Sequence, residues 1–185
     1  MNYMDGEHDP GGKVRRARTD IATVPAVFSV CGRYRYRLER QWDTGAGRVL
    51  FVMMNPSTAD DTTDDPTVAK CQKYARRWGF AGLLVGNVCA FRATHPKMLL
   101  EAQDPVGLAN HRALLDMARE SSRVVMAHGI LPSQPLRAQA THVALSLRER
   151  GFPLYVLKLT AAGIPAHPLY LPDALQPTLW NPLAS

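Results

Sequence analysis

Four short apolar runs, separated by amphipathic stretches, constrain the fold of this chain more than any other feature. The runs are RVLFVMM (48–54), GFAGLLVGNVCAF (79–91), RVVMAHG (123–129) and FPLYVLKL (152–159). Apolar residues at helical spacing lie between them. Strands that are apolar on both faces and alternate with helices are typical of a parallel sheet covered on both sides. We therefore predict an α/β fold, a three-layer α/β/α sandwich around a central four-stranded parallel sheet.

A β-hairpin is predicted ahead of this sheet, over residues 26–42. Its second arm alternates apolar and basic residues. We expect the apolar face to pack on the domain, and the basic face, Arg33, Arg35 and Arg37, to meet water or phosphate groups. Residues 1–22 are rich in glycine and charge, which predicts a flexible basic tail, and residues 23–185 then form a single domain that includes the hairpin.

The formal net charge of +6 is concentrated in one segment. Residues 13–48 hold nine lysines and arginines against three acidic residues, an excess equal to that of the whole chain. Such a bias suits a polyanionic partner, of which nucleic acid, most simply DNA, is the first expectation. A solvated face and tail is the alternative interpretation.

Composition and missing motifs exclude several classes of protein. No apolar run reaches about 18 residues, so no membrane span and no membrane partner are expected, and the first residues lack the apolar core of a secretion signal. Cys31, Cys71 and Cys89 are scattered, which favours reduced thiols in the cytoplasm over zinc or iron–sulfur ligation. We find no phosphate-cradling glycine motif and no G-x-S-x-G elbow, and expect no cofactor or resident metal.

Polar side chains follow each predicted strand, where ligands bind in parallel α/β sheets. They are Asn55 and Ser57 after the first strand, Asn87, Arg92, Thr94 and His95 around the second, His128 after the third, and Thr160 and His167 after the fourth. An asparagine side chain offers an acceptor and a donor side by side, which matches the edge of a nucleobase. A histidine can donate to a ring oxygen that gains charge as a leaving group departs. These residues indicate a site for a flat heterocycle.

The order and spacing of FVMMNPS, LLVGNVCAFRATHP, VVMAHG and AHPLYLP resemble the motif series of the uracil-DNA glycosylase superfamily, over about residues 48–172. Within it, NPSTAD and HPLYL look most similar to a bacterial and phage family of unknown function. The resemblance implies that Asn55 positions water, Asn87 reads the base and His167 stabilises the departing base. It also implies that residues 168–170 form a loop that grips DNA.

This chain departs from the superfamily pattern at several positions. Met53 replaces a glycine, Leu169 replaces a serine, and STADDTTDDPT lacks the aromatic residue that stacks on the base. Phe91 or Tyr170 is the substitute we expect for that stacking residue. These departures favour a modified base over uracil as the substrate.

Four aspartates within residues 60–65 raise a separate question. Asp65 precedes Pro66, a pair typical of an N-cap and first helical turn. Because Asn55 cannot accept a proton, we assign the general base to one of the remaining three, with Asp61 as the choice. A Mg²⁺ site and a solvated loop are the alternatives.

The sequence thus predicts a DNA N-glycosylase that flips out and excises a nucleobase. Ser57 would contact the base, and Arg92, His95 and the arginines of the hairpin would hold the nucleic-acid backbone. Three alternatives stay open: a non-catalytic reader of nucleobases or nucleic acid, a hydrolase of nucleosides or nucleotides, and a metal-dependent nuclease.

Overall fold

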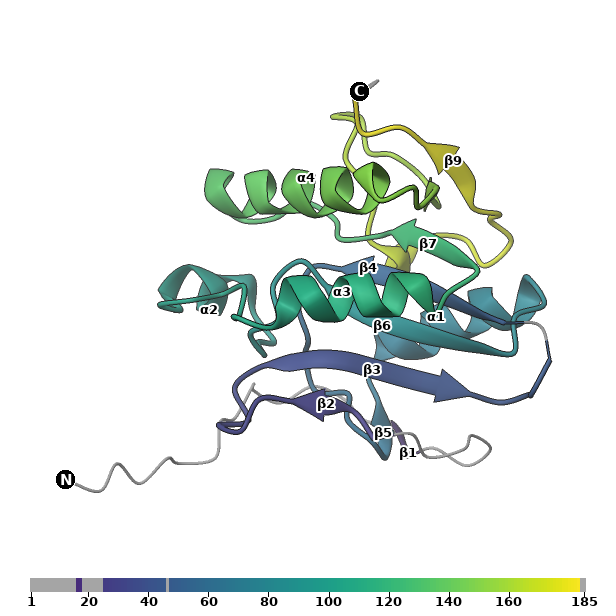
Figure 1. The fold of residues 1–185 in the computed structure, drawn as a ribbon, viewed down its shortest axis with the longest axis horizontal. Helices are drawn as coiled ribbons and strands as arrows, with labels where there is room; N and C mark the ends of the chain where they lie inside the picture. Colours follow the sequence, from purple (N-terminus) through teal and green to yellow (C-terminus); the bar gives the residue numbers. More distant parts are fainter. Residues whose placement is uncertain (1–15, 18–24, 46, 184–185) are drawn as a thin grey trace.

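The computed structural model describes residues 16–17, 25–45 and 47–183. Its main feature is a seven-stranded sheet in the order β2-β3-β6-β4-β7-β8-β9 (Figure 1). The strands are β2 (Val27–Phe28), β3 (Arg35–Gln41), β4 (Arg48–Met53), β6 (Gly82–Asn87), β7 (Arg123–Met126), β8 (Leu154–Val156) and β9 (Thr178–Trp180).

The sheet is mixed, so the predicted four-stranded parallel sheet is wrong. Strand β4 pairs in parallel with β6 and β7, and β7 with β8, but β2–β3, β3–β6 and β8–β9 are antiparallel. The predicted hairpin does not precede the sheet, because its second arm, β3, joins the sheet through backbone hydrogen bonds to β6. Strand β9 comes from the proline-rich stretch near the end of the chain, and three residues are too few to show a period.

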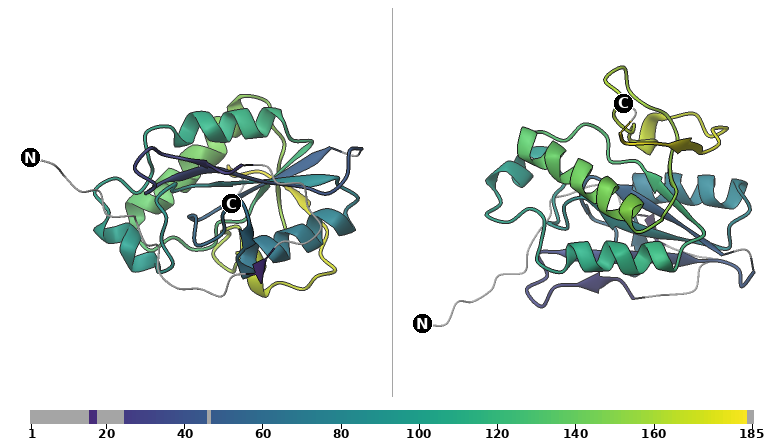
Figure 2. Two further views of the ribbon diagram at one scale, coloured as in Figure 1. Left: turned by 90° about the horizontal axis from the view of Figure 1, so that it is seen from below. Right: turned by 45° about the horizontal axis from the view of Figure 1, so that its top comes forward.

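Helices cover both faces of the sheet. Helices α2 (Pro96–Glu101), α3 (Asn110–Arg119) and α4 (Gln134–Glu149) pack in one apolar cluster with Leu50 and Val52 of β4. Helix α1 (Pro66–Arg77) packs in a second cluster with Val49 and Phe51. Figure 2 shows α1 on the opposite side of the sheet from α3. Because side chains of a strand alternate, the continuous apolar run of β4 supplies both cores.

A β-bulge in β3 separates the arginines of the predicted basic face. Val27 faces Arg37 and Phe28 faces Arg35, so one residue of β3, Tyr36, is extra in the pairing. The bulge sends Arg35 toward the α1 side, where it is buried, and Arg37 toward the opposite side, where it pairs with Glu120 at the end of α3. The prediction that Arg33, Arg35 and Arg37 share one exposed face is therefore wrong, and of the three only Arg33 is exposed.

A second, two-stranded sheet lies next to the aspartate-rich segment. Strand β1 (Arg16–Ala17) pairs antiparallel with β5 (Thr63–Asp64). The other residues of the predicted tail, 1–15 and 18–22, lie outside the described part of the chain. Among the described residues, no helix is long and apolar enough to cross a membrane.

Candidate functional site

A cavity of about 180 Å³ opens beyond the carboxyl end of β4. Its walls are the β4–α1 loop, the first turn of α1, the segment 93–96 and the residue before the 3₁₀ helix η1 (Pro168–Tyr170). The polar side chains that line it are Arg35, Asn55, Ser57, Asp65, Thr67, Thr94 and His167. The volume is below the roughly 300 Å³ at which pockets for drug-sized ligands begin. The cavity is thus suited to one small ring or group.

Asn55 lines this cavity, and its amide nitrogen is held by the protein. Its Nδ2 donates to the carbonyl oxygens of Pro56 (2.8 Å) and Ala93 (2.6 Å). Both amide hydrogens are thereby used, and the two carbonyls assign the orientation of the amide group. The side chain offers Oδ1 to a ligand, as a residue that positions water requires.

Asp65 supplies the carboxylate of the cavity and also caps α1. Its Oδ1 accepts a hydrogen bond from the backbone N–H of Val68 (2.9 Å), and Pro66 occupies the first helical turn. The predicted N-cap is confirmed. The side chain is buried, and the positive end of the helix dipole stabilises its negative charge. The sequence indicated the cap but not the exposure of this carboxylate to the cavity.

His167 enters the cavity from the far end of the chain. Its Nδ1 accepts from the backbone N–H of Leu169 (3.4 Å), so in the neutral ring Nε2 carries the hydrogen and can donate. Gly129 (φ +68°) donates its N–H to the carbonyl of Pro165 (2.9 Å), and a Cβ there would lie 3.1 Å from the Cβ of His167. The segment after β7 therefore packs closely against this histidine, and the positive φ of Gly129 favours glycine at this position.

Arg35 forms the basic part of the lining, although its side chain is buried. Nη1 donates to the carbonyl oxygen of Ala59 (2.7 Å), and Nε has no hydrogen-bond partner among the described residues. Within that part of the chain Arg35 also forms no ion pair. Burial lowers the pKa of its guanidinium to about 10, so the group is still a cation at neutral pH. Sequence reasoning missed this residue as a pocket residue because the bulge in β3 reverses the face that alternation predicts.

Two hydroxyl groups of the lining also lack partners. Ser57 Oγ and Thr94 Oγ1 are buried without a hydrogen bond to any described residue. Buried polar atoms are nearly always paired in folded proteins, so each such atom needs an explanation. Both residues follow strand ends, which is the signal by which the sequence pointed to them.

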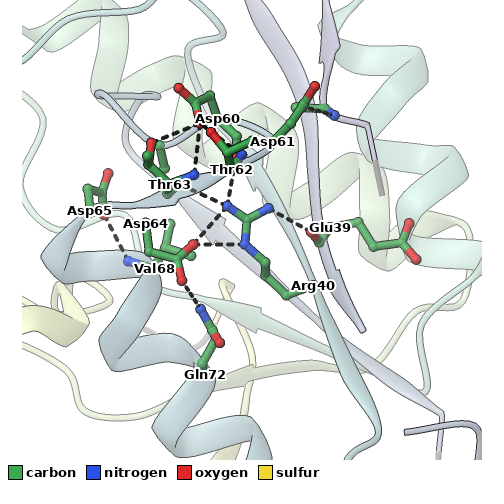
Figure 3. A network of polar contacts seen from close by, with 12 residues as sticks. Glu39, Arg40, Asp60, Asp61, Thr62, Thr63, Asp64, Asp65, Val68 and Gln72 are labelled. Atoms are coloured by element: carbon green, nitrogen blue, oxygen red, sulfur yellow. Dashed lines mark hydrogen bonds and ion pairs between the residues drawn. The ribbon is translucent and has the colours of Figure 1, made fainter. Parts of the chain in front are cut away.

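The aspartate-rich segment is built around Arg40, whose side chain is fully buried (Figure 3). Arg40 forms an ion pair with Asp64 (2.7 Å) and donates to the backbone carbonyls of Asp60 (2.7 Å) and Thr63 (3.0 Å). Gln72 of α1 donates to the other oxygen of Asp64 (2.5 Å). The network ties the β4–α1 loop to β3 and α1. Because this loop is one wall of the cavity, the network holds that wall in place.

The other two aspartates of the segment also make structural contacts. Asp60 accepts hydrogen bonds from the backbone and side chains of Thr62 and Thr63. Asp61, the predicted general base, accepts from the backbone N–H of Ala26 (2.5 Å), and it does not line the cavity. Of the four aspartates, Asp65 is the one at the cavity. Within the described ranges, no group of three or more metal-ligating residues comes together.

Asn87, the predicted base-reading residue, does not line the cavity. It lies at the end of β6, paired with Met53, which does. Its carbonyl oxygen accepts from Asn110, and its buried Nδ2 has no partner among the described residues. Two of the three residues that the resemblance assigns to one site, Asn55 and His167, share the cavity, and the third is next to a lining residue.

The remaining predicted residues are not among those that line the cavity. Phe91 packs edge-on against Tyr34, with ring centroids 5.7 Å apart, and Tyr170 is 90% exposed. Arg92 donates to the carbonyl of Gly32 (3.0 Å), which is a structural contact. His95 is exposed just before α2.

A second cavity, of about 240 Å³, has Gly129 in its lining. Its lining is mainly apolar and includes Leu131, Ile164 and Trp180. His128 also lines it; burial lowers the pKa of its imidazole, whose Nδ1 lies 2.7 Å from the carbonyl oxygen of Gly129. The first cavity has more polar and ionisable side chains in its lining than the second.

A carboxylate, an amide and an imidazole thus line one small cavity at the carboxyl end of a central strand of the mixed sheet. The chain belongs to the family of proteins of unknown function designated DUF1643, whose model matches residues 35–169. The match includes every polar residue that lines the first cavity. Comparisons with curated proteins and with solved structures gave no match.

Proposed function

We propose that the protein hydrolyses the N-glycosidic bond of a nucleobase, most simply a modified base in DNA, with the base held in the first cavity. The observation that carries the proposal is that Asn55 and Asp65, at the two ends of the β4–α1 loop, line one small cavity with His167 from the far end of the chain. The sequence resemblance to the uracil-DNA glycosylase superfamily supports it at Asn55 and His167. A base in a duplex would have to flip out to reach this cavity.

The chemistry follows from the atoms that the lining offers. Asn55 Oδ1 and the Asp65 carboxylate accept the two hydrogens of a water molecule. As the bond between the sugar carbon and the base nitrogen breaks, Asp65 stabilises the cationic sugar by charge and takes a proton from the attacking water. His167 Nε2–H donates its proton to an exocyclic carbonyl oxygen of the departing base, which leaves with the bonding electron pair; the proton that Asp65 took from water then returns to the imidazole through solvent. The products are the free base and a sugar with a hydroxyl group.

The proposal is tested by mass spectrometry of free bases released from a panel of DNAs with modified bases, in the presence of a chelator. We expect one base to be released and the remaining strand to break in alkali. His167→Ala should lower the rate by roughly 10²-fold or more, the scale of general acid catalysis. His142→Ala, in an exposed residue of α4 outside the cavity, is the matched control and should act at the parental rate. Strand breaks that need added Mg²⁺ would instead identify a nuclease.

Hydrolysis of a free nucleoside or nucleotide is a second candidate, and one observation favours it. Much of the basic charge near the sheet is neutralised within the protein: Arg37 and Arg48 both pair with Glu39 and Glu120. This leaves less charge for a nucleic-acid backbone than the sequence suggested. A polymer substrate predicts that the rate falls steeply with salt, whereas a nucleoside substrate predicts little dependence on salt.

A further inference from the structure

The lining of the first cavity includes three polar groups without a hydrogen-bond partner in the described chain. They are Arg35 Nε, Ser57 Oγ and Thr94 Oγ1, and each of these atoms is buried. Arg35 and Thr94 are more than nine-tenths buried. All three groups line the same cavity, although they come from β3, the β4–α1 loop and the segment after β6. Three unpartnered groups at one cavity are harder to explain by local structure than a single one.

The chemistry of these groups selects the ligand that completes them. A guanidinium has only donors, and both hydroxyls can donate, so the complementary ligand is an acceptor. A buried cation without an ion pair is unfavourable, and a negatively charged acceptor relieves this where a neutral one does not. Hydrogen bonds between a guanidinium and an oxyanion are also stronger than neutral ones.

Asp65 lines the same cavity, and its negative charge offsets only part of the cost of burying Arg35. Burial lowers the pKa of the guanidinium to about 10 although the nearby Asp65 carboxylate acts to raise it, and Asp65 Oδ1 also accepts the backbone N–H of Val68. The cavity is therefore bipolar, with a cationic side at Arg35 and an anionic side at Asp65. A ligand with a negative group and an electron-poor sugar would be oriented by both.

We propose that Arg35, Ser57 and Thr94 form an oxyanion subsite, and that the substrate carries a carboxylate or phosphate group bound there. This rests on the proposed function only in taking the substrate to be a nucleobase or nucleotide. A carboxylate on the base and a phosphate of a nucleotide offer the same chemistry to the subsite, and the experiment separates them.

The test is isothermal titration calorimetry of the full chain with three probes: uracil-5-carboxylate, uracil and inorganic phosphate. We expect one of the two anions to bind at least tenfold more tightly than uracil. The anion that binds identifies the source: uracil-5-carboxylate indicates a charged base, and phosphate indicates a nucleotide. Equal affinity for uracil and both anions, or no binding of either anion, would overturn the subsite.

Matched variants keep the test valid if changes at Arg35 impair folding. Thr94→Val and Ser57→Ala remove one donor each and should weaken anion binding roughly tenfold, the effect of one hydrogen bond to a charged group. Thr58→Val is the control, because Thr58 Oγ1 is also buried without a partner but does not line the cavity. If Thr94→Val and Thr58→Val bind the anion equally well, the assignment of the donors is wrong.

The two proposals fail in different ways. Anion binding that Thr94→Val weakens, in a protein that releases no base, supports the subsite and removes the glycosylase function. Release of uncharged bases by a protein that binds neither anion removes the subsite and keeps the function.

Discussion

Replacing Arg40 by methionine should destabilise the protein strongly, because the change leaves a carboxylate buried without its cation. Arg40 is fully buried, and its ion pair with Asp64 is supplemented by donations to the backbone carbonyls of Glu39, Asp60 and Thr63. Removing one partner of a buried pair costs about 3–5 kcal/mol. At about 2–4 °C per kcal/mol for a chain of this size, Tm should fall by about 6–20 °C.

Thermal unfolding followed by circular dichroism measures this shift, with two further variants. Arg112→Met removes an exposed pair with Asp116 on the surface of α3 and should change stability by less than about 1 kcal/mol. The double variant Arg40→Met/Asp64→Asn removes the orphaned charge and should recover part of the loss. A fall in Tm no larger for Arg40→Met than for Arg112→Met would refute the view that Arg40 organises the aspartate-rich loop. A double variant less stable than Arg40→Met would show that the cost does not come from the orphaned carboxylate.

Three other predictions concern the cavity, a thiol and a surface ion pair. Gly129→Ala forces a side chain into a left-handed backbone beside the pocket histidine, and should cost about 1–2 kcal/mol in unfolding assays and slow base release. The pKa of the Cys31 thiol is lowered to about 7, and the hydrogen bond with Ser29 contributes most to this shift. The rate at which Cys31 is alkylated should therefore reach half its maximum near pH 7. A half-maximal rate above pH 8, measured by mass spectrometry over time, would contradict this. The hydrogen bond from Arg37 lowers the pKa of the Glu120 carboxyl below its ordinary value of 4.5. The ionised carboxylate therefore stabilises the folded protein above pH 4.5, and this stabilisation is lost as the pH falls through the lower pKa of the folded state. Unfolding curves of Glu120→Gln should therefore differ from those of the parent protein at pH 7 and converge with them in acid.

The positions of the central strands could be predicted from sequence, but the pairing at the edges could not. The four apolar runs form β4, β6, β7 and β8, because strands buried on both faces need apolar residues throughout. Strands β3 and β9 join the sheet through backbone hydrogen bonds, which no side-chain pattern records. The bulge at Tyr36 likewise leaves no mark in the side-chain pattern, so the burial of Arg35 could not be predicted from the sequence.

The cavity was predictable in part. Asn55, Ser57 and His167 were found because ligands gather beyond the carboxyl ends of strands, and the structure brings these three together. The general base was misplaced because the roles of the aspartates depend on partners distant in sequence. Arg40, which engages Asp64, lies 24 residues before it, and Ala26, which engages Asp61, lies 35 residues before it.

The release of free base by Asp65→Asn and Asp61→Asn, measured side by side with the parent protein, tests the central claim most directly. Asparagine is as good an N-cap as aspartate, so Asp65→Asn should keep α1 intact and shift Tm little, while the cavity loses its carboxylate. We predict that Asp65→Asn releases base about 10²–10⁴-fold more slowly than the parent, and that Asp61→Asn releases it at the parental rate. Release by Asp65→Asn at the parental rate, or release of no base from any DNA by the parent protein, would contradict the account.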